Sequence, residues 1–293
     1  MTPSMVRVPI EKIVHGGHGE KCEDSLAVEE PLEIRVGGKS ISVTMRTPGN
    51  DFELAAGFLL SEGIVSQPSH IADITRMPDG NPNIVVVTLS REASAKPLVV
   101  QRAFVMTSAC GLCGKASLAA LESNRCPALP PQSTTFDAEI LHGLPEAIRL
   151  RQSVFDRTGG LHAAALFDSR GRLESLHEDV GRHNAVDKLI GDALLRGRTP
   201  LGDSMVLVSG RASYELVQKC LMGGVPLLAA VGAPSSLAVS TAVRSGMTLV
   251  GFLRDGRFNV YSEPERLQRT GRRGGPPIVR NPAEAVVRVE SEE

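Results

Sequence analysis

The chain has 293 residues, of which 42% are hydrophobic, 3% aromatic and 22% charged, and its formal net charge is −1. A charge so close to zero creates no global field that would attract nucleic acid or an acidic membrane surface. Aromatic side chains are scarce and tryptophan is missing, so a base-stacking platform for single-stranded nucleic acid is also excluded.

The N-terminus lacks the long apolar stretch of a signal peptide, and the apolar run at residues 225–231 is too short to cross a bilayer. The cysteines are odd in number and widely scattered, unlike the disulfide framework of a small secreted domain. They are Cys22, Cys110, Cys113, Cys126 and Cys220. We therefore expect a cytoplasmic protein with no membrane or nucleic-acid partner.

The first quarter of the chain predicts an arm followed by a sheet. Residues 1–30 are polar and weakly periodic, which predicts a loosely held arm. Residues 33–45 predict two strands joined by a hairpin turn at Gly37-Gly38. A helix is expected after Asn50, a good N-cap residue, with Glu53 at the capping-box position.

Further strands are expected at residues 84–89 and 99–106, which completes a smaller β-rich N-terminal subdomain over residues 31–135. Cys110 and Cys113 follow as a CxxC motif. Two thiols at this spacing can bind a metal, form a disulfide or carry a sulfur atom.

These three chemistries stay open on the residues alone. Zinc would need two further Cys or His ligands, and the sequence has no second CxxC. A thioredoxin-like pair would need a surrounding βαβ pattern that is missing. A sulfur carrier needs an exposed thiolate near positive charge, which Lys115 would supply.

The second half alternates strands and helices, which predicts an α/β fold over residues 136–262 with a mixed, largely parallel sheet flanked by helices. Pro145 is expected to break the helical stretch 138–151. Residues 263–293 are rich in Arg, Gly and Pro and predict a disordered tail. The expected strands are 163–167, 173–177, 205–208, 226–231, 248–253 and 257–261, and the expected helices include 214–222 and 235–244.

Polar residues gather at unusual places in this half. His162 follows Gly159-Gly160; it is either a core histidine or an acid, base or donor to an anionic group. Arg182 and His183, with Asn184, occupy the first turn of an expected helix, where cations are unfavourable. Such a cluster suits an anion or a polar ring. The turn at residues 209–213 could hold a phosphate, although many α/β loops look like this.

Taken together, seven segments that run in order through residues 30–262 resemble the FdhD family, sulfurtransferases accessory to formate dehydrogenase. They are TPGNDFELAAGFLLSEGI at 47–64, SACGLCG at 108–114, TGGLHAAALF at 158–167, EDVGRHNAVDKLIG at 178–191, VSGRASYELVQKC at 208–220, GVPLLAAVGAPSSLAV at 224–239 and GMTLVGFLRDGRFNVY at 246–261.

The resemblance implies a sulfur relay. Such proteins take persulfide sulfur from a cysteine desulfurase and pass it to the molybdenum cofactor, a bis-molybdopterin guanine dinucleotide, before its insertion into the catalytic subunit of formate dehydrogenase. The persulfide would fall on Cys110, with Cys113 assisting. A runner-up hypothesis is a non-catalytic cofactor chaperone whose cysteines form only a redox latch. No tightly bound metal of the protein's own is expected.

The resemblance also implies a homodimer with a cytidine-deaminase-like core that binds the guanine nucleotide of the cofactor. His162, Arg182 and His183 are expected to contribute to this site. A zinc deaminase needs H-x-E, which the residues after His162 do not supply, so hydrolytic deamination is excluded. The segment expected to bind the cofactor is Phe252, Leu253, Arg254, Asp255, Gly256 and Arg257.

Overall fold

A computed structural model describes residues 3–17, 19–77, 80–94, 104–105, 126–130 and 134–269. Cys110, Cys113 and most of the strand expected at residues 99–106 lie outside the described residues. None of the helices in these ranges is both long and apolar enough to cross a membrane.

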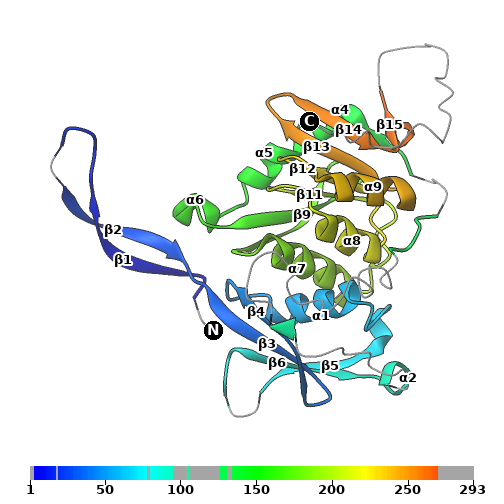
Figure 1. The fold of residues 1–293 in the computed structure, drawn as a ribbon, viewed down its shortest axis with the longest axis horizontal. Helices are drawn as coiled ribbons and strands as arrows, with labels where there is room; N and C mark the ends of the chain where they lie inside the picture. Colours follow the sequence, from blue (N-terminus) through cyan, green and yellow to red (C-terminus); the bar gives the residue numbers. More distant parts are fainter. Residues whose placement is uncertain are drawn as a thin grey trace, which may run out of the picture.

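The N-terminal arm is a β-hairpin of β1 (Met5–Lys12) and β2 (Glu20–Ala27), paired antiparallel along its whole length. It projects away from the body of the molecule (Figure 1). The sequence predicts no strands here, because both faces of the hairpin are largely exposed and alternation has no buried face to mark it.

Within the described ranges the N-terminal sheet has five strands in the order β5-β6-β3-β4-β7. The hairpin expected around Gly37-Gly38 is confirmed, and both glycines have positive φ, which a tight turn requires. The bounds are β3 (Glu30–Val36), β4 (Lys39–Arg46), β5 (Ile71–Arg76), β6 (Ile84–Leu89) and β7 (Phe104–Val105), with the short helices η1 (Pro68–His70) and α2 (Arg91–Ser94).

Helix α1 (Asp51–Ser61) follows β4, but the predicted capping box is wrong. Asn50 has a left-handed backbone (φ 54°), and its side chain makes no capping hydrogen bond. Asp51 instead turns back and accepts hydrogen bonds from the buried Arg46 guanidinium at 2.9 and 3.2 Å. The ion pair between Arg46 and Asp51 thus takes the place of a capping box at the start of this helix, and the local sequence pattern does not reveal it.

The larger sheet has six strands in the order β10-β9-β11-β12-β13-β14. A mixed sheet is confirmed, but a largely parallel one is wrong, because only the β11–β12 and β12–β13 pairs are parallel. Hairpins at both edges and the antiparallel β9–β11 pair outnumber them. The bounds are β9 (His162–Asp168), β10 (Leu173–Asp179), β11 (Ser204–Val208), β12 (Leu227–Ala230), β13 (Thr248–Arg254) and β14 (Arg257–Ser262).

Helices cover both faces of the larger sheet. On one face, α7 (Arg182–Leu195), α8 (Tyr214–Met222) and α9 (Ser236–Ser245) pack against alternate strand residues such as Ala164 and Val206. The intervening residues, such as Ala165 and Leu207, belong to a second core under α4 (Ala138–Leu141) and α5 (Leu144–Arg149). The break expected at Pro145 is confirmed, because Pro145 lies in the first turn of α5.

Helix α1 lies between the smaller sheet and α7, so one hydrophobic core joins the two sheets (Figure 1). Gly57 and Gly191 mark the crossing of α1 and α7. A Cβ at Gly57 would lie 1.9 Å from Asp187 O, and one at Gly191 would lie 1.8 Å from Glu53 O. The helices approach so closely because each presents a glycine to the other's backbone.

The predicted tail begins too early. Residues 263–269 form η3 (Pro264–Arg266) and β15 (Leu267–Gln268), and β15 pairs in parallel with β8 (Phe136–Asp137). Arg266 is buried and donates hydrogen bonds to Thr248 Oγ1 at 3.1 Å and Gly246 O at 2.8 Å. Arg266 lies in an arginine-rich stretch of the sequence that is typical of a solvated tail, but its side chain packs at the edge of the core.

Candidate functional site

The polar residues singled out in the second half meet at one edge of the six-stranded sheet. Strands β11, β12 and β13 run parallel, so their carboxyl ends share this edge. Strand β9 runs the opposite way and begins there with His162, which pairs with Asp179 at the end of β10. Open α/β sheets commonly bind ligands where parallel strands end.

Three helices begin at the same edge, after β10, β11 and β12 respectively (Figure 1). The N-cap residues Gly181 and Ser213 make no side-chain capping bond, and the first turn of α7 has no acidic residue. Only α9 is capped by its own N-cap side chain, through Ser235 Oγ and Ala238 N. The first turn of α8 carries Glu215, so it is the uncapped N–H groups and the dipole of α7 that favour an anion at this edge.

His162 lines a pocket of about 300 Å³ at this edge. Burial lowers the pKa of His162, the charges of Arg182 and His183 lower it further, and the Asp179 carboxylate opposes them. A neutral imidazole can donate one hydrogen bond and accept another. The other lining residues are Gln152, Phe155, Gly159, Gly160, Leu161 and Ser209. The sequence offers no signal for Gln152 or Phe155, which come from a connecting segment and the short helix α6 (Phe155–Thr158).

Arg182, the first residue of α7, is partly exposed near His162. Its Nε is buried and has no hydrogen-bond partner among the described residues. A guanidinium that is partly exposed and has no protein acceptor for its Nε can bind an anionic oxygen through its exposed side. The structure thus places Arg182 near His162; that the two residues share a ligand site stays a prediction.

His183 points elsewhere. It is 3% exposed, and its Nε2 lies 2.8 Å from Glu215 Oε2 and 3.3 Å from Ser213 Oγ. This ring nitrogen therefore links α7 to the start of α8 and is not available to a ligand. The Ser209–Ser213 turn, where the sequence gives a weak indication of phosphate binding, lies at the edge beside it.

The segment from Phe252 to Arg257 projects beyond the edge at the end of β13 and the start of β14. Leu253 is buried in the second core, so its side chain does not face a ligand. The Arg254 guanidinium is half exposed, lies over the Phe252 ring at 5.8 Å, and is 3.9 Å from Asp255 Oδ2. Arg257 is exposed. Three strand spacings, or roughly 14 Å, separate β13 from β9, so Arg254 and Arg257 lie on the same edge as His162 but at a distance from it.

Glycines let the loops of this edge pack closely. A Cβ at Gly232 would lie 3.1 Å from Gly210 O, and one at Gly251 would lie 2.8 Å from Pro234 Cδ. Phe252 N donates to Gly232 O at 3.0 Å. The loops after β11 and β12 are therefore fixed against the end of β13.

Among the described residues, the acidic side chains form no metal site and the buried Cys220 is not reactive. In the described ranges, no cluster of three or more His, Cys, Asp or Glu side chains could hold a metal ion. Cys220 is fully buried, which raises the pKa of its thiol to about 12, so it stays protonated and unreactive. Burial, followed by the neighbouring Cys126, raises the pKa of Tyr214 to about 12.

A model of the FdhD/NarQ family matches residues 27–268. Two curated relatives are each named sulfur carrier protein FdhD. That of Mycobacterium bovis is 51% identical over 253 residues, covering 83% of this chain and 92% of the relative. That of Sulfolobus acidocaldarius is 42% identical over 261 residues, covering 89% and 98%. A crystal structure of a formate dehydrogenase accessory protein from Desulfotalea psychrophila has a TM-score of 0.72 at 27% identity, covering 91% of this chain and all of that one.

Proposed function

The chain belongs to the FdhD/NarQ family, and on that premise we propose that it is a sulfur carrier in the maturation of formate dehydrogenase. It takes persulfide sulfur from a cysteine desulfurase on Cys110, with Cys113 assisting, and delivers it to the molybdenum of a bis-molybdopterin guanine dinucleotide. The homodimer and the cytidine-deaminase-like core implied by the family resemblance stay predictions.

The first step needs no external oxidant or reductant. The Cys110 thiolate attacks the terminal sulfur of the persulfide on the desulfurase. The S–S bond of the donor breaks, the donor cysteine leaves as a thiolate, and Cys110 carries the sulfur as a new persulfide. One S–S bond forms as another breaks, so the electrons balance.

The second step uses Cys113. Its thiolate attacks the Sγ of Cys110, and the terminal sulfur leaves with the bonding pair as hydrosulfide, which the molybdenum substrate accepts. Cys110 and Cys113 are left as a disulfide. A dithiol reductant then supplies the two electrons that restore both thiols.

The observation that supports delivery to a nucleotide-bearing substrate is the row of anion-binding groups along one sheet edge. The uncapped start of α7, the Arg182 Nε, which has no partner among the described residues, and the exposed Arg254 and Arg257 suit the phosphates of a dinucleotide. The neutral His162 and the pocket beside it suit the polar edge of a base. The sulfur chemistry itself rests on the names of the relatives.

The sulfur step is tested by incubating the full chain with a cysteine desulfurase and radiolabelled cysteine. We expect Cys110→Ala to lose the label that dithiothreitol releases, and Cys22→Ala, a matched control in the N-terminal hairpin, to keep it. Mass spectrometry of the tryptic peptide at residues 103–115 identifies the cysteine that carries the extra sulfur. Full label in both Cys110→Ala and Cys113→Ala would refute the relay.

The cofactor-chaperone alternative gives a different result. If the cysteines form only a redox latch, a Cys110→Ser/Cys113→Ser variant still activates formate dehydrogenase fully. The sulfur carrier requires that this variant binds the cofactor but leaves the enzyme inactive.

A further inference from the structure

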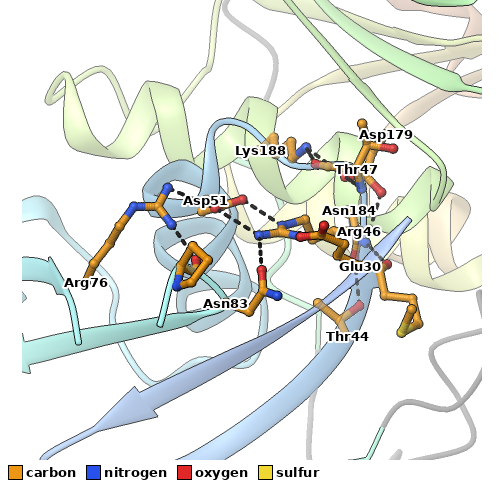
Figure 2. A network of polar contacts seen from close by, with 12 residues as sticks. Glu30, Thr44, Arg46, Thr47, Asp51, Arg76, Asn83, Asp179, Asn184 and Lys188 are labelled. Carbon is orange, nitrogen blue, oxygen red and sulfur yellow. Dashed lines mark hydrogen bonds and ion pairs between the residues drawn. The ribbon is translucent and has the colours of Figure 1, made fainter. Parts of the chain in front are cut away.

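Asp179, the last residue of β10, lies beside the candidate site without facing it. Its carboxylate is fully buried among donors from two parts of the chain (Figure 2). Oδ1 accepts hydrogen bonds from Gly181 N at 2.8 Å and Asn184 Nδ2 at 3.1 Å. Oδ2 accepts from Thr47 N at 3.2 Å and pairs with Lys188 Nζ at 2.7 Å. Four donors use the lone pairs of both oxygens, so the carboxylate has none left for a substrate.

The bond from Gly181 N to Asp179 Oδ1 closes a turn immediately before α7. Arg182 is the next residue, so this turn determines where its side chain leaves the backbone. A Cβ at Gly181 would lie 3.0 Å from Asn184 Nδ2 and 3.4 Å from Asp179 Oδ1, which leaves little room for a larger residue. The start of α7 is thus held by contacts that Arg182 does not make.

The same carboxylate belongs to a junction between α7 and the end of β4 (Figure 2). Lys188 Nζ also donates to Thr47 O at 2.8 Å, and Val180 N donates to Thr47 Oγ1 at 3.2 Å. Asn184 Nδ2 donates to Met45 O at 2.7 Å. Because every donor here is paired inside the protein, the junction acts as one rigid unit.

Electrostatics link the same carboxylate to the pocket. Asp179 pairs with His162 across β9 and β10, and its charge raises the pKa of His162 against burial and the nearby cations. Among the described residues, the ionisable groups that act on the pKa of His162 are Asp179 and the two α7 residues Arg182 and His183, while Gln152 and Ser209 line the pocket without titrating. Removing the carboxylate charge therefore lowers the pKa of His162 further.

We propose that Asp179 is a positioning residue of the candidate site: it holds the turn that places Arg182 where the phosphates of a guanine nucleotide bind. This role rests on the proposed function, because it needs the nucleotide to bind at this edge. Each oxygen of Asp179 faces two donors, so an amide at position 179 sets its NH₂ group against either Gly181 N and Asn184 Nδ2 or Thr47 N and Lys188 Nζ. The conservative change Asp179→Asn therefore disrupts the junction that holds the turn without changing side-chain size.

Isothermal titration of the full chain with GDP tests the proposal through a double-mutant cycle. Arg182→Ala and Asp179→Asn are each expected to weaken GDP binding about tenfold, as for the loss of one charge-assisted contact. In the double variant the affinity is expected to stay within about twofold of Arg182→Ala, since Asp179 acts through Arg182. NMR titration is expected to show a lower pKa for His162 in Asp179→Asn.

Asp51→Asn is the matched control, because Asp51 is an equally buried carboxylate that pairs with Arg46 at 2.9 Å and Arg76 at 3.0 Å (Figure 2). It is expected to lose stability but to leave GDP affinity and the His162 titration unchanged. If Asp179→Asn does not fold, Gly181→Ala displaces the same turn with the Lys188 ion pair intact, and is expected to give the same tenfold loss.

Two results overturn the role of Asp179. One is wild-type GDP affinity in Asp179→Asn or, where that variant does not fold, in Gly181→Ala. The other is losses that multiply to about 100-fold in the double variant, which would mean that the two residues act independently. Failure of the wild-type chain to bind GDP instead overturns the proposed nucleotide site, and the positioning role with it.

Discussion

The glycine crossing of α1 and α7 predicts that Gly191→Ala destabilises the whole chain. The added methyl would lie 1.8 Å from Glu53 O and 2.6 Å from Gly57 N. Both atoms belong to backbone, so no side-chain rotation can relieve the overlap. The two helices must instead separate by about 1.6 Å, the difference between 1.8 Å and the 3.4 Å at which ordinary contact begins.

Two effects oppose each other in this substitution. Alanine is favoured over glycine inside a helix by about 1 kcal/mol. Overpacking of a close-packed core costs about 1–3 kcal/mol and occasionally more, and a backbone overlap belongs at the upper end. Separating the helices also loosens contacts in the core that joins the two sheets. We therefore expect Gly191→Ala to lower the free energy of unfolding by about 2 kcal/mol or more.

Urea unfolding followed by circular dichroism measures this loss. Gly202→Ala is the control, because a Cβ there meets no atom within 4 Å and Gly202 has no positive φ. The free energy of unfolding of Gly202→Ala is expected to differ from that of the wild type by less than about 0.5 kcal/mol. A Gly191→Ala variant as stable as the wild type would show that the crossing tolerates separation, and the reasoning from backbone overlap would fail.

Three further predictions concern ionisable side chains. Burial lowers the pKa of His177 from its ordinary value of 6.5. The contribution of His177 to stability is therefore present above about pH 6.5 and is lost as the pH falls towards the folded pKa. His177→Gln is expected to weaken the loss of stability between pH 7 and 5, and an unchanged pH profile would contradict this. Lys219→Met leaves the buried Asp187 carboxylate without the ammonium group that lies 2.7 Å from it. This variant is expected to lose about 3–5 kcal/mol of the free energy of unfolding, measured in urea, and Lys219→Met/Asp187→Asn is expected to recover part of that loss. Tyr214→Phe is expected to remove the phenolate absorbance change that appears near pH 12, and a change that persists in this variant would assign it elsewhere.

Local signals in the sequence predict the local structure well. The helix at Tyr214–Met222 has the bounds that its pattern predicts, and the hairpin of β9 and β10 follows from the turn after Asp168. Longer-range features are missed. Arg266 has the sequence appearance of a tail residue, and only the approach of Thr248 from a distant strand makes it part of the core. The direction of β9 relative to β11 likewise depends on where α7 leads the chain, which no local pattern contains.

The same limit divides the polar cluster at residues 182–184. An α-helix turns by about 100° per residue, so three consecutive side chains leave it in three directions. Arg182 remains at the sheet edge, and its Nε has no partner in the part of the chain that the structure describes. His183 reaches Glu215 on α8, and Asn184 reaches Met45 O at the end of β4. The composition of this helix start therefore predicts a cluster of polar side chains. Only the packing of α7 determines that one of the three, Arg182, remains available to an anion. Sequence alone could not separate the ligand-binding group from the two connections that hold it in place.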